Sequence, residues 1–197
     1  MTPTIYFARH GETEWNSIRR VQGALDSPLT AKGRDQARDV GRILLDELGY
    51  KPDYRLVASP RGRALETAGF IAEALGLTIK TDERLTEVTL GSWDGLTRDE
   101  IDRRIGPGFA DPTGEAWHFE APDGESFAAA RQRVSSWLDE IDCNTIAAGH
   151  GLSGKILRGI YADLDEVQSL ALAEPQGEVF RMKDGAIARL SLAGVVA

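Results

Sequence analysis

Cysteine is nearly absent from this chain of 197 residues, in which Cys143 is the single one. It cannot form a disulfide within the chain, so a reducing compartment is favoured and Cys143 itself is interpreted as a small core side chain. No stretch approaches the roughly 18 consecutive apolar residues that a membrane span requires. The first residues, Met1 to Ala8, lack both the basic start and the long apolar run of a secretory leader. We therefore expect a cytoplasmic protein without a membrane partner.

Basic residues are also fewer than acidic ones: the chain has 23 Lys and Arg against 31 Asp and Glu, which gives a formal net charge of −8. A protein that binds nucleic acid or an anionic membrane carries a basic face, so this balance argues against both partners. A small anionic substrate stays possible, since a local cluster of cations can oppose the net charge. The length predicts one domain over residues 1–197.

Short apolar runs alternate with helical patterns, which predicts an α/β fold with a mostly parallel sheet. Strands are expected at residues 4–8, 55–58, 77–85 and 145–148. Helices are expected at 31–48, at 60–75 with Ser59 as its cap, from Thr97, at 127–141 and at 152–161. Near the end, runs at 179–183 and 186–192 flank Asp184-Gly185, a hairpin signal that predicts an antiparallel edge.

The segment from Gly106 to Gly124 interrupts this pattern, since seven of its nineteen residues are Gly or Pro. That composition predicts a long loop, and long loops in compact domains often cover a site. The alternative is a surface loop that covers no site. We interpret residues 96–125 as a lid insertion within the domain.

Histidines and arginines gather at three predicted strand ends, in Arg9-His10-Gly11, in Ser59-Pro60-Arg61-Gly62-Arg63 and in Gly149-His150-Gly151. Ligands of an open parallel sheet bind beyond the carboxyl ends of its strands. An arginine in the first turn of a helix is unfavourable for the helix dipole, and a bound anion would resolve that conflict for Arg61 and Arg63. A phosphate site at this edge is therefore the economical hypothesis.

Six segments in this order resemble the histidine phosphatase superfamily, the phosphoglycerate-mutase-like proteins. They are Arg9-His10-Gly11-Glu12-Thr13-Glu14-Trp15-Asn16, then Arg20-Val21-Gln22-Gly23 with Asp26-Ser27-Pro28-Leu29-Thr30, then Ser59 to Ala68, Leu85-Thr86-Glu87 with Gly91 to Gly95, Pro122 to Ser126, and Gly149-His150-Gly151. The resemblance spans about residues 4 to 160. It departs from the family pattern at Asp94, where Glu is usual, and at Asp123, where Gly is frequent. It implies three layers, with helices on both faces of the central sheet.

The resemblance implies that His10 is the nucleophile that takes the phosphoryl group, with Gly11 as an open turn beside it. Imidazole suits this role, because one ring nitrogen attacks while a hydrogen bond holds the other. Glu87 would be the general acid for the leaving alkoxide and then the base for water.

The remaining implied residues surround the phosphate. Arg9 and Arg63 would clamp its oxygens, His150 would be a third positive or donor group, and Asn16 and Gln22 would form hydrogen bonds around it. The same segments add three residues at the phosphate: Gly23, Gly151 and Leu152. Two further candidates for contact with the rest of the substrate are Arg20 and His118. No metal and no cofactor is implied, because the histidines and arginines already carry the chemistry.

Three functions remain open. The first is a histidine acid phosphatase-type phosphomonoester hydrolase acting on a small phosphorylated molecule. The second is a cofactor-dependent phosphoglycerate mutase, which is disfavoured because the family's mutases are longer and because Gly151-Leu152-Ser153 follows the second histidine. The third is a phosphoryl-binding protein without catalysis. Sugar phosphates, nucleotide-like phosphates, phosphoglycerates and α-ribazole phosphate all remain candidate substrates, and a homo-oligomer is possible.

Overall fold

The computed structural model describes residues 2–105 and 116–196. The predicted lid is therefore described at its two ends, 96–105 and 116–125, and its middle lies outside the described residues. Strands of the described part form one sheet in the order β3-β2-β4-β1-β5-β6-β7. Their bounds are β1 Ile5–Arg9, β2 Arg55–Ala58, β3 Ile79–Thr81, β4 Thr145–Gly149, β5 Val179–Lys183, β6 Ala186–Ser191 and β7 Gly194–Val196.

The centre of the sheet is parallel and one side of it is antiparallel. β1 pairs in parallel with β4, and β4 with β2, which in turn pairs with β3. On the other side of β1, the β5–β6 hairpin and β7 continue the sheet in antiparallel fashion. The expected mostly parallel α/β sheet with an antiparallel edge is confirmed, and the hairpin turn falls at Asp184-Gly185 as the sequence predicts.

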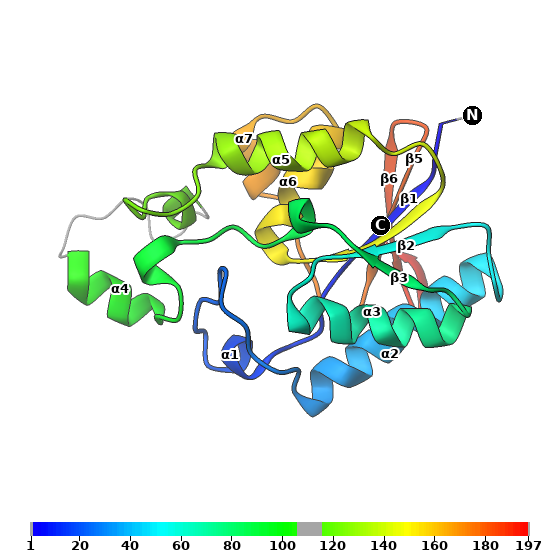
Figure 1. Cartoon of the computed structure of the whole chain (residues 1–197), viewed down its shortest axis with the longest axis horizontal. Coiled ribbons are helices and arrows are strands. Elements are labelled where there is room, and N and C mark those ends of the chain that lie inside the picture. The colour runs from blue at the N-terminus through cyan, green and yellow to red at the C-terminus, as the bar shows by residue number, and fades with distance from the viewer. Residues whose placement is uncertain (1, 106–115, 197) are drawn as a thin grey trace.

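Helices cover both faces of the sheet (Figure 1). Their bounds are α1 Glu14–Ser17, α2 Ala31–Leu48, α3 Gly62–Leu75, α4 Arg98–Ile105, α5 Phe127–Asp139, α6 Gly151–Tyr161 and α7 Glu166–Leu170. One buried cluster joins the sheet to α2 and α3, and another joins its opposite face to α5, α6 and α7. Alternation along β1 explains this, because Tyr6 and Ala8 belong to the first cluster while Ile5 and Phe7 belong to the second.

Local signals place most helix ends where the sequence predicts them. The side chain of Thr30 accepts a hydrogen bond from Gly33 N at the start of α2, and Gly49 ends that helix with a φ of 76°. The predicted cap at Ser59 is wrong, since α3 begins at Gly62 with Arg61 in the capping position. The physical reason is that the hydroxyl of Ser59 bonds the ring of His150.

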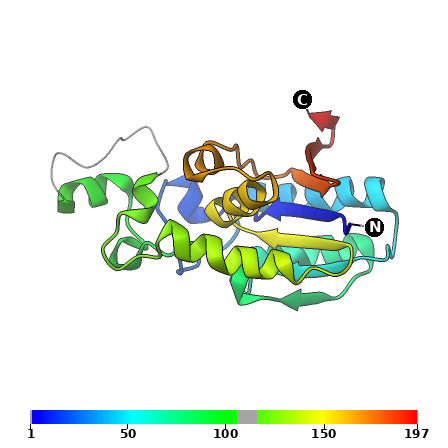
Figure 2. The same cartoon turned by 90° about the horizontal axis from the view of Figure 1, so that it is seen from above.

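The predicted helix after Thr97 is α4, and its capping box is complete. Thr97 N donates to the Glu100 carboxylate at 2.7 Å, and Glu100 N donates back to the Thr97 hydroxyl at 3.3 Å. Around it lies a third, smaller apolar cluster in which Leu90, Trp93 and Ile101 are buried. In Figure 2, β1 and β4 both point toward the end of the molecule where α1 and α4 lie, so their carboxyl ends face that side.

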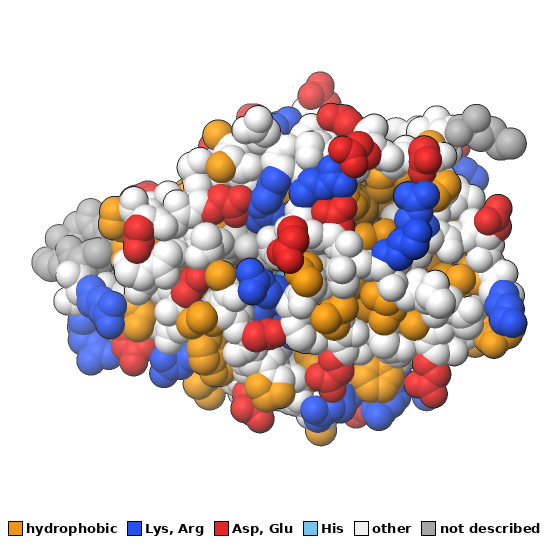
Figure 3. All heavy atoms as spheres, viewed as in Figure 1, with side chains coloured by type: hydrophobic (Ala, Val, Ile, Leu, Met, Phe, Trp, Pro, Cys, Tyr) orange, Lys and Arg blue, Asp and Glu red, His pale blue; other side chains and the backbone are white. Residues whose placement is uncertain are grey.

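The surface matches the acidic but mixed composition. On the face shown in Figure 3, acidic and basic side chains are interspersed over the whole view, with apolar side chains between them. No helix of the described residues is long and apolar enough to cross a membrane.

The turn after β1 lies directly against α2 at two glycines. A Cβ on Gly33 would overlap the backbone oxygen of Glu12, and one on Gly11 would overlap the backbone oxygen of Gly33. Backbone atoms cannot yield as side chains do, so this close approach requires glycine on both sides. The contact fixes the turn that follows His10.

We expect Gly33→Ala to lower the free energy of unfolding by about 1–3 kcal/mol, because the added methyl overpacks a backbone contact. Gly69→Ala is the matched control, since Gly69 also lies in a helix and nothing stands within 4 Å of an added Cβ. That variant should be more stable by about 0.5–1 kcal/mol. Urea unfolding of both variants measures the difference, and equal effects would contradict the close approach.

Candidate active site

His10 follows the last residue of β1 and is buried, with 2% of its surface exposed. Its Nδ1 lies 2.8 Å from the backbone oxygen of Gly11, and a carbonyl can only accept, so Nδ1 carries the proton. Burial lowers the pKa of His10 well below its usual value, and the charges of Arg9 and Arg63 lower it further. His10 is therefore neutral near pH 7, with the lone pair of Nε2 available.

His150 follows β4 and lies edge-on to His10, with the ring centroids 5.2 Å apart. Its Nδ1 accepts a hydrogen bond from Arg63 Nε at 3.2 Å, so the proton sits on Nε2, which donates to the Ser59 hydroxyl at 2.7 Å. Burial is the largest cause that lowers the pKa of His150, followed by the charge of Arg63. Of the two roles that the sequence left open, the structure favours a neutral group over a third positive charge.

Arg63 lies in the first turn of α3 and is 1% exposed. Its Nη1 donates to the backbone oxygen of Leu25 at 2.6 Å and to Asp26 at 3.0 Å, and its Nη2 donates to the backbone oxygen of Gly23 at 3.0 Å. Burial lowers the pKa of Arg63, while Glu87 and Asp26 raise it. The protein itself holds this guanidinium firmly in place.

Arg9 is bound far less completely. Its Nη1 donates to the backbone oxygen of Glu174 at 2.9 Å, and its buried Nε has no hydrogen-bond partner in the described part of the chain. A buried donor without a partner costs about 1–3 kcal/mol, and an anion in the cavity would satisfy it. Arg9 is thus the arginine with open donors.

Glu87 lies across the cavity at the start of α6. Its carboxylate accepts hydrogen bonds from Leu152 N and Ser153 N, each at 3.1 Å, and from Val88 N at 3.0 Å. A helix N-terminus favours a negative group, so this placement follows from the exposed N–H groups of α6. A Cβ on Gly151 would stand 3.5 Å from both Arg9 Nε and Glu87 Oε2, so both atoms lie close to Gly151.

These side chains line one cavity of about 370 Å³. The predicted site residues that line it are Arg9, His10, Asn16, Arg20, Gln22, Gly23, Arg63, Glu87, His118, Gly151 and Leu152. Gly11 and His150 do not line it: Gly11 accepts from His10, and His150 lies behind His10 and Arg63. The structure therefore brings the predicted residues to one place, while their roles stay predictions.

The side chains that the sequence assigned to phosphate or substrate differ in how free they are. Asn16 Oδ1 already accepts hydrogen bonds from Thr13 N and the amide of Gln176, whereas the buried Gln22 Oε1 has no partner among the described residues. Arg20 donates to the backbone oxygen of Gly95 and lies 3.5 Å from Glu100 of α4. Arg20 therefore ties the cavity to α4 as well as lining it.

His118 reaches the cavity from the far end of the predicted lid, where its ring lies 3.8 Å from that of Trp117. Asp94 and Asp123, the two departures from the family pattern, both have structural partners. Asp94 accepts from Ala24 N, Thr89 Oγ1 and Leu90 N, and Asp123 accepts from Ser92.

Sequence reasoning missed one wall of the cavity. It is formed by Lys155 of α6 and by three residues after α7: Leu172, Ala173 and Glu174. Glu174 is paired with Arg158, and burial raises its pKa to about 7 although Arg158 and Arg9 oppose the shift. No pattern in the sequence marks these residues, because helical spacing places Lys155 and Arg158 among apolar neighbours. Within the described residues, no group of three or more His, Cys, Asp or Glu is arranged to hold a metal ion.

Comparison with known families agrees with this geometry. Residues 5–169 match the histidine phosphatase superfamily, branch 1. The chain belongs to this superfamily. A curated relative from Escherichia coli O1:K1, named probable phosphoglycerate mutase GpmB, is 38% identical over 152 residues, or 74% of this chain and 65% of the relative. The chain thus spans less than two thirds of the length of that relative.

Solved structures from the superfamily resemble the chain over nearly all of its length. Bacillus stearothermophilus YhfR is 32% identical with a TM-score of 0.74, covering 100% of this chain and 95% of that one. A mycobacterial glucosyl-3-phosphoglycerate phosphatase in complex with VO3 is 28% identical with a TM-score of 0.74, covering 91% of this chain and 90% of that one. The superfamily thus includes both phosphatases and mutase-like proteins among the relatives of this chain.

The two buried histidines should show opposite tautomers. We expect nitrogen-detected NMR near pH 7 to find His10 protonated on Nδ1 and His150 protonated on Nε2, because their partners are a carbonyl oxygen and an arginine N–H. Since both pKa values are lowered, both rings should stay neutral when the pH falls to 6. Two rings with the same tautomer, or a ring that titrates at its usual pKa of about 6.5, would contradict this arrangement.

Gly151→Ala should weaken phosphate binding without weakening the fold. The methyl would stand 3.4–3.5 Å from Arg9 and Glu87, which is ordinary contact, but it would block the open Nε–H of Arg9. Loss of one charge-assisted hydrogen bond predicts a roughly 10- to 100-fold fall in affinity for inorganic phosphate. Calorimetric titration measures the affinity, with Gly69→Ala as the control. Unchanged affinity would show that Arg9 Nε does not meet the anion.

Proposed function

We propose that the chain is a phosphatase that hydrolyses a small-molecule phosphate monoester through a phosphohistidine on His10. The observation that carries the proposal is the neutral His10, whose Nε2 is free to attack, in the same cavity as an arginine with open donors. Phosphoryl transfer depends mainly on positioning and on stabilising charge at the phosphoryl oxygens. Arg9 and one N–H of Arg63 supply both.

In the first step, the lone pair of His10 Nε2 forms a bond to phosphorus while the bond from phosphorus to the ester oxygen breaks. The leaving oxygen takes the proton of the phosphate monoanion, which the Glu87 carboxylate relays as the general acid. The Nδ1–H of His10 stays on the backbone oxygen of Gly11, which stabilises the positive charge that develops on the ring. Alcohol leaves, and the phosphoryl group remains on Nε2.

In the second step, a water molecule attacks phosphorus and the N–P bond breaks. The Glu87 carboxylate takes one proton of the water and passes it to the inorganic phosphate that is released. Glu87 thereby returns to the carboxylate form that its N–H partners favour, and His10 to its neutral tautomer, so no group is consumed.

A phosphoglycerate mutase is the second candidate, because the 38% identical relative carries that name. A mutase must return the phosphoryl group to a bound intermediate before water reaches it. The solved phosphatase that aligns over 91% of this chain supports the first candidate, since the mutase relative is matched over 65% of its own length. Phosphate binding without turnover would instead support the non-catalytic reading.

The proposal is tested with purified protein and a chromogenic phosphomonoester in the presence of EDTA. We expect phosphate release, and a loss of at least ~10³-fold in His10→Ala, because the attacking nitrogen is gone. A labelled substrate should leave acid-labile phosphate on the wild type and none on the variant.

Activity that survives His10→Ala unchanged would rule out the assigned nucleophile. The rate of interconversion of 2- and 3-phosphoglycerate, compared with the rate of phosphate release, separates mutase from phosphatase. A panel of sugar, nucleotide and glycerate phosphates, ranked by kcat/KM, then identifies the substrate class.

A further inference from the structure

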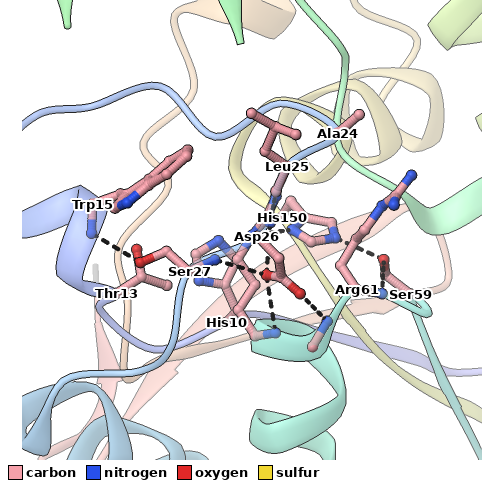
Figure 4. Close-up of polar contacts among 12 residues, drawn as sticks. His10, Thr13, Trp15, Ala24, Leu25, Asp26, Ser27, Ser59, Arg61 and His150 are labelled. Carbon is pink, nitrogen blue, oxygen red and sulfur yellow. Dashed lines mark hydrogen bonds and ion pairs between the residues drawn. The ribbon is translucent and has the colours of Figure 1, made fainter. Parts of the chain in front are cut away.

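Asp26 is an acidic side chain that lies beside the cavity without lining it. It comes from the segment after α1, yet its carboxylate accepts hydrogen bonds from Gly62 N, Arg63 N and Arg63 Nη1, the last at 3.0 Å (Figure 4). A fourth contact goes to its own neighbour, Ser27 N, at 3.2 Å. One carboxylate thus joins the start of α3 to the side chain of Arg63.

The start of α3 lacks a local cap, since Arg61 in the capping position forms no side-chain hydrogen bond to the helix. Asp26 replaces that cap from 36 residues away in the sequence. A carboxylate at this place satisfies the exposed N–H groups and is favoured by the helix dipole. Capping alone would give Asp26 a purely structural role.

The contact with the guanidinium indicates a second role. Arginine has five N–H donors in a rigid plane. In Arg63, four of the five already have protein acceptors: the ring of His150 for Nε, Leu25 O and Asp26 for Nη1, and Gly23 O for Nη2. Among the residues that the structure describes, none accepts from the second N–H of Nη2, which leaves it for a ligand, and its direction depends on how the other four are held.

Asp26 is the only charged acceptor among these four, because the others are two backbone oxygens and a neutral ring. Charge-assisted hydrogen bonds are roughly twice as strong as neutral ones. The Arg63 side chain is 1% exposed, whereas that of Asp26 is 38% exposed. The positive charge of the buried guanidinium therefore needs a nearby negative charge to offset the loss of water around it.

We propose that Asp26 is a positioning residue for phosphoryl transfer: it holds the Arg63 guanidinium so that its one open N–H meets the transferred group. The proposal rests on the proposed phosphatase function. Without the carboxylate, only three neutral acceptors hold the guanidinium, so it tilts, and both its open N–H and its bond to His150 lose their alignment. A displacement of about 1 Å at such a group can cost about 10²-fold in rate.

A double-mutant cycle separates positioning from capping. We expect Asp26→Asn to lower kcat/KM for the chromogenic phosphomonoester by about 10²-fold. In an Arg63→Ala background the same substitution should cost less than about threefold, because its target is gone. Equal losses in both backgrounds would overturn the proposal, since they would show that Asp26 acts without Arg63.

Two further variants complete the design. Asp26→Asn keeps an oxygen of the same reach, which can still accept from Gly62 N, and removes the charge that holds the guanidinium. Asp26→Ser removes both, because its hydroxyl is one bond shorter, and we expect it to lose no more activity than Asp26→Asn does. Wild-type turnover in Asp26→Asn would overturn the proposal in favour of capping. Asp35→Asn is the charge control, because Asp35 pairs with Arg38 on the exposed side of α2 and should be silent. Should Asp26→Asn fail to fold, the cycle is run with Asp26→Ser.

Titration with inorganic phosphate keeps the two proposals apart. A wild type that binds phosphate but hydrolyses no phosphomonoester overturns the proposed function and leaves Asp26 to be judged by binding alone. In that case the positioning role predicts roughly tenfold weaker phosphate binding in Asp26→Asn than in the wild type, as expected for a weakened charge-assisted bond. Adding Asp26→Asn to Arg63→Ala should then weaken phosphate binding no further. Unchanged binding would overturn it.

Discussion

The buried guanidinium of Arg63 is the constraint around which the loop from Gln22 to Asp26 is built. A buried charge is costly unless it is paired and hydrogen-bonded. The loop meets this requirement with two backbone oxygens and the carboxylate of Asp26. To present its oxygen, Gly23 takes a φ of 50°, and a side chain there would also overlap Asp94. Gly23 thus presents its oxygen to Arg63, and Asp94 holds the same loop by accepting from Ala24 N.

Two of the arginines that line the cavity, Arg9 and Arg63, have different roles. Arg63 has nearly all its donors engaged by the protein, whereas Arg9 donates to the backbone oxygen of Glu174 and its buried Nε has no partner within residues 2–105 and 116–196. The guanidinium of Arg9 can thus reorganise around an arriving anion, while the open N–H of Arg63 points in a fixed direction. Both charges lower the pKa of His10. The cations that favour a phosphate therefore also keep the imidazole in the unprotonated form that can attack it.

Much of the fold was predictable because its signals are local. The spacing of Ala37, Val40 and Leu44 predicts α2, and the glycine after it ends the helix. The site residues were predictable where they belong to the segments that resemble the superfamily. Ser59 was interpreted wrongly because its hydroxyl bonds a ring 91 residues away. Asp26 stands in a recognised segment, but its contact with Arg63 was missed, as was the contact of Arg9 with Glu174, because the partners are 37 and 165 residues apart and no periodicity records such contacts.

Charge alone cannot explain how this cavity would hold a phosphate. The chain carries a net charge of −8, and His10 and His150 are neutral, so the positive charge around His10 comes from Arg9 and Arg63. Asp26 offsets the second of these. What remains is a set of directed N–H groups, and such groups select a tetrahedral array of oxygens rather than any anion. Direction is also what phosphoryl transfer needs, since the attacking and leaving atoms must stand roughly in line through phosphorus.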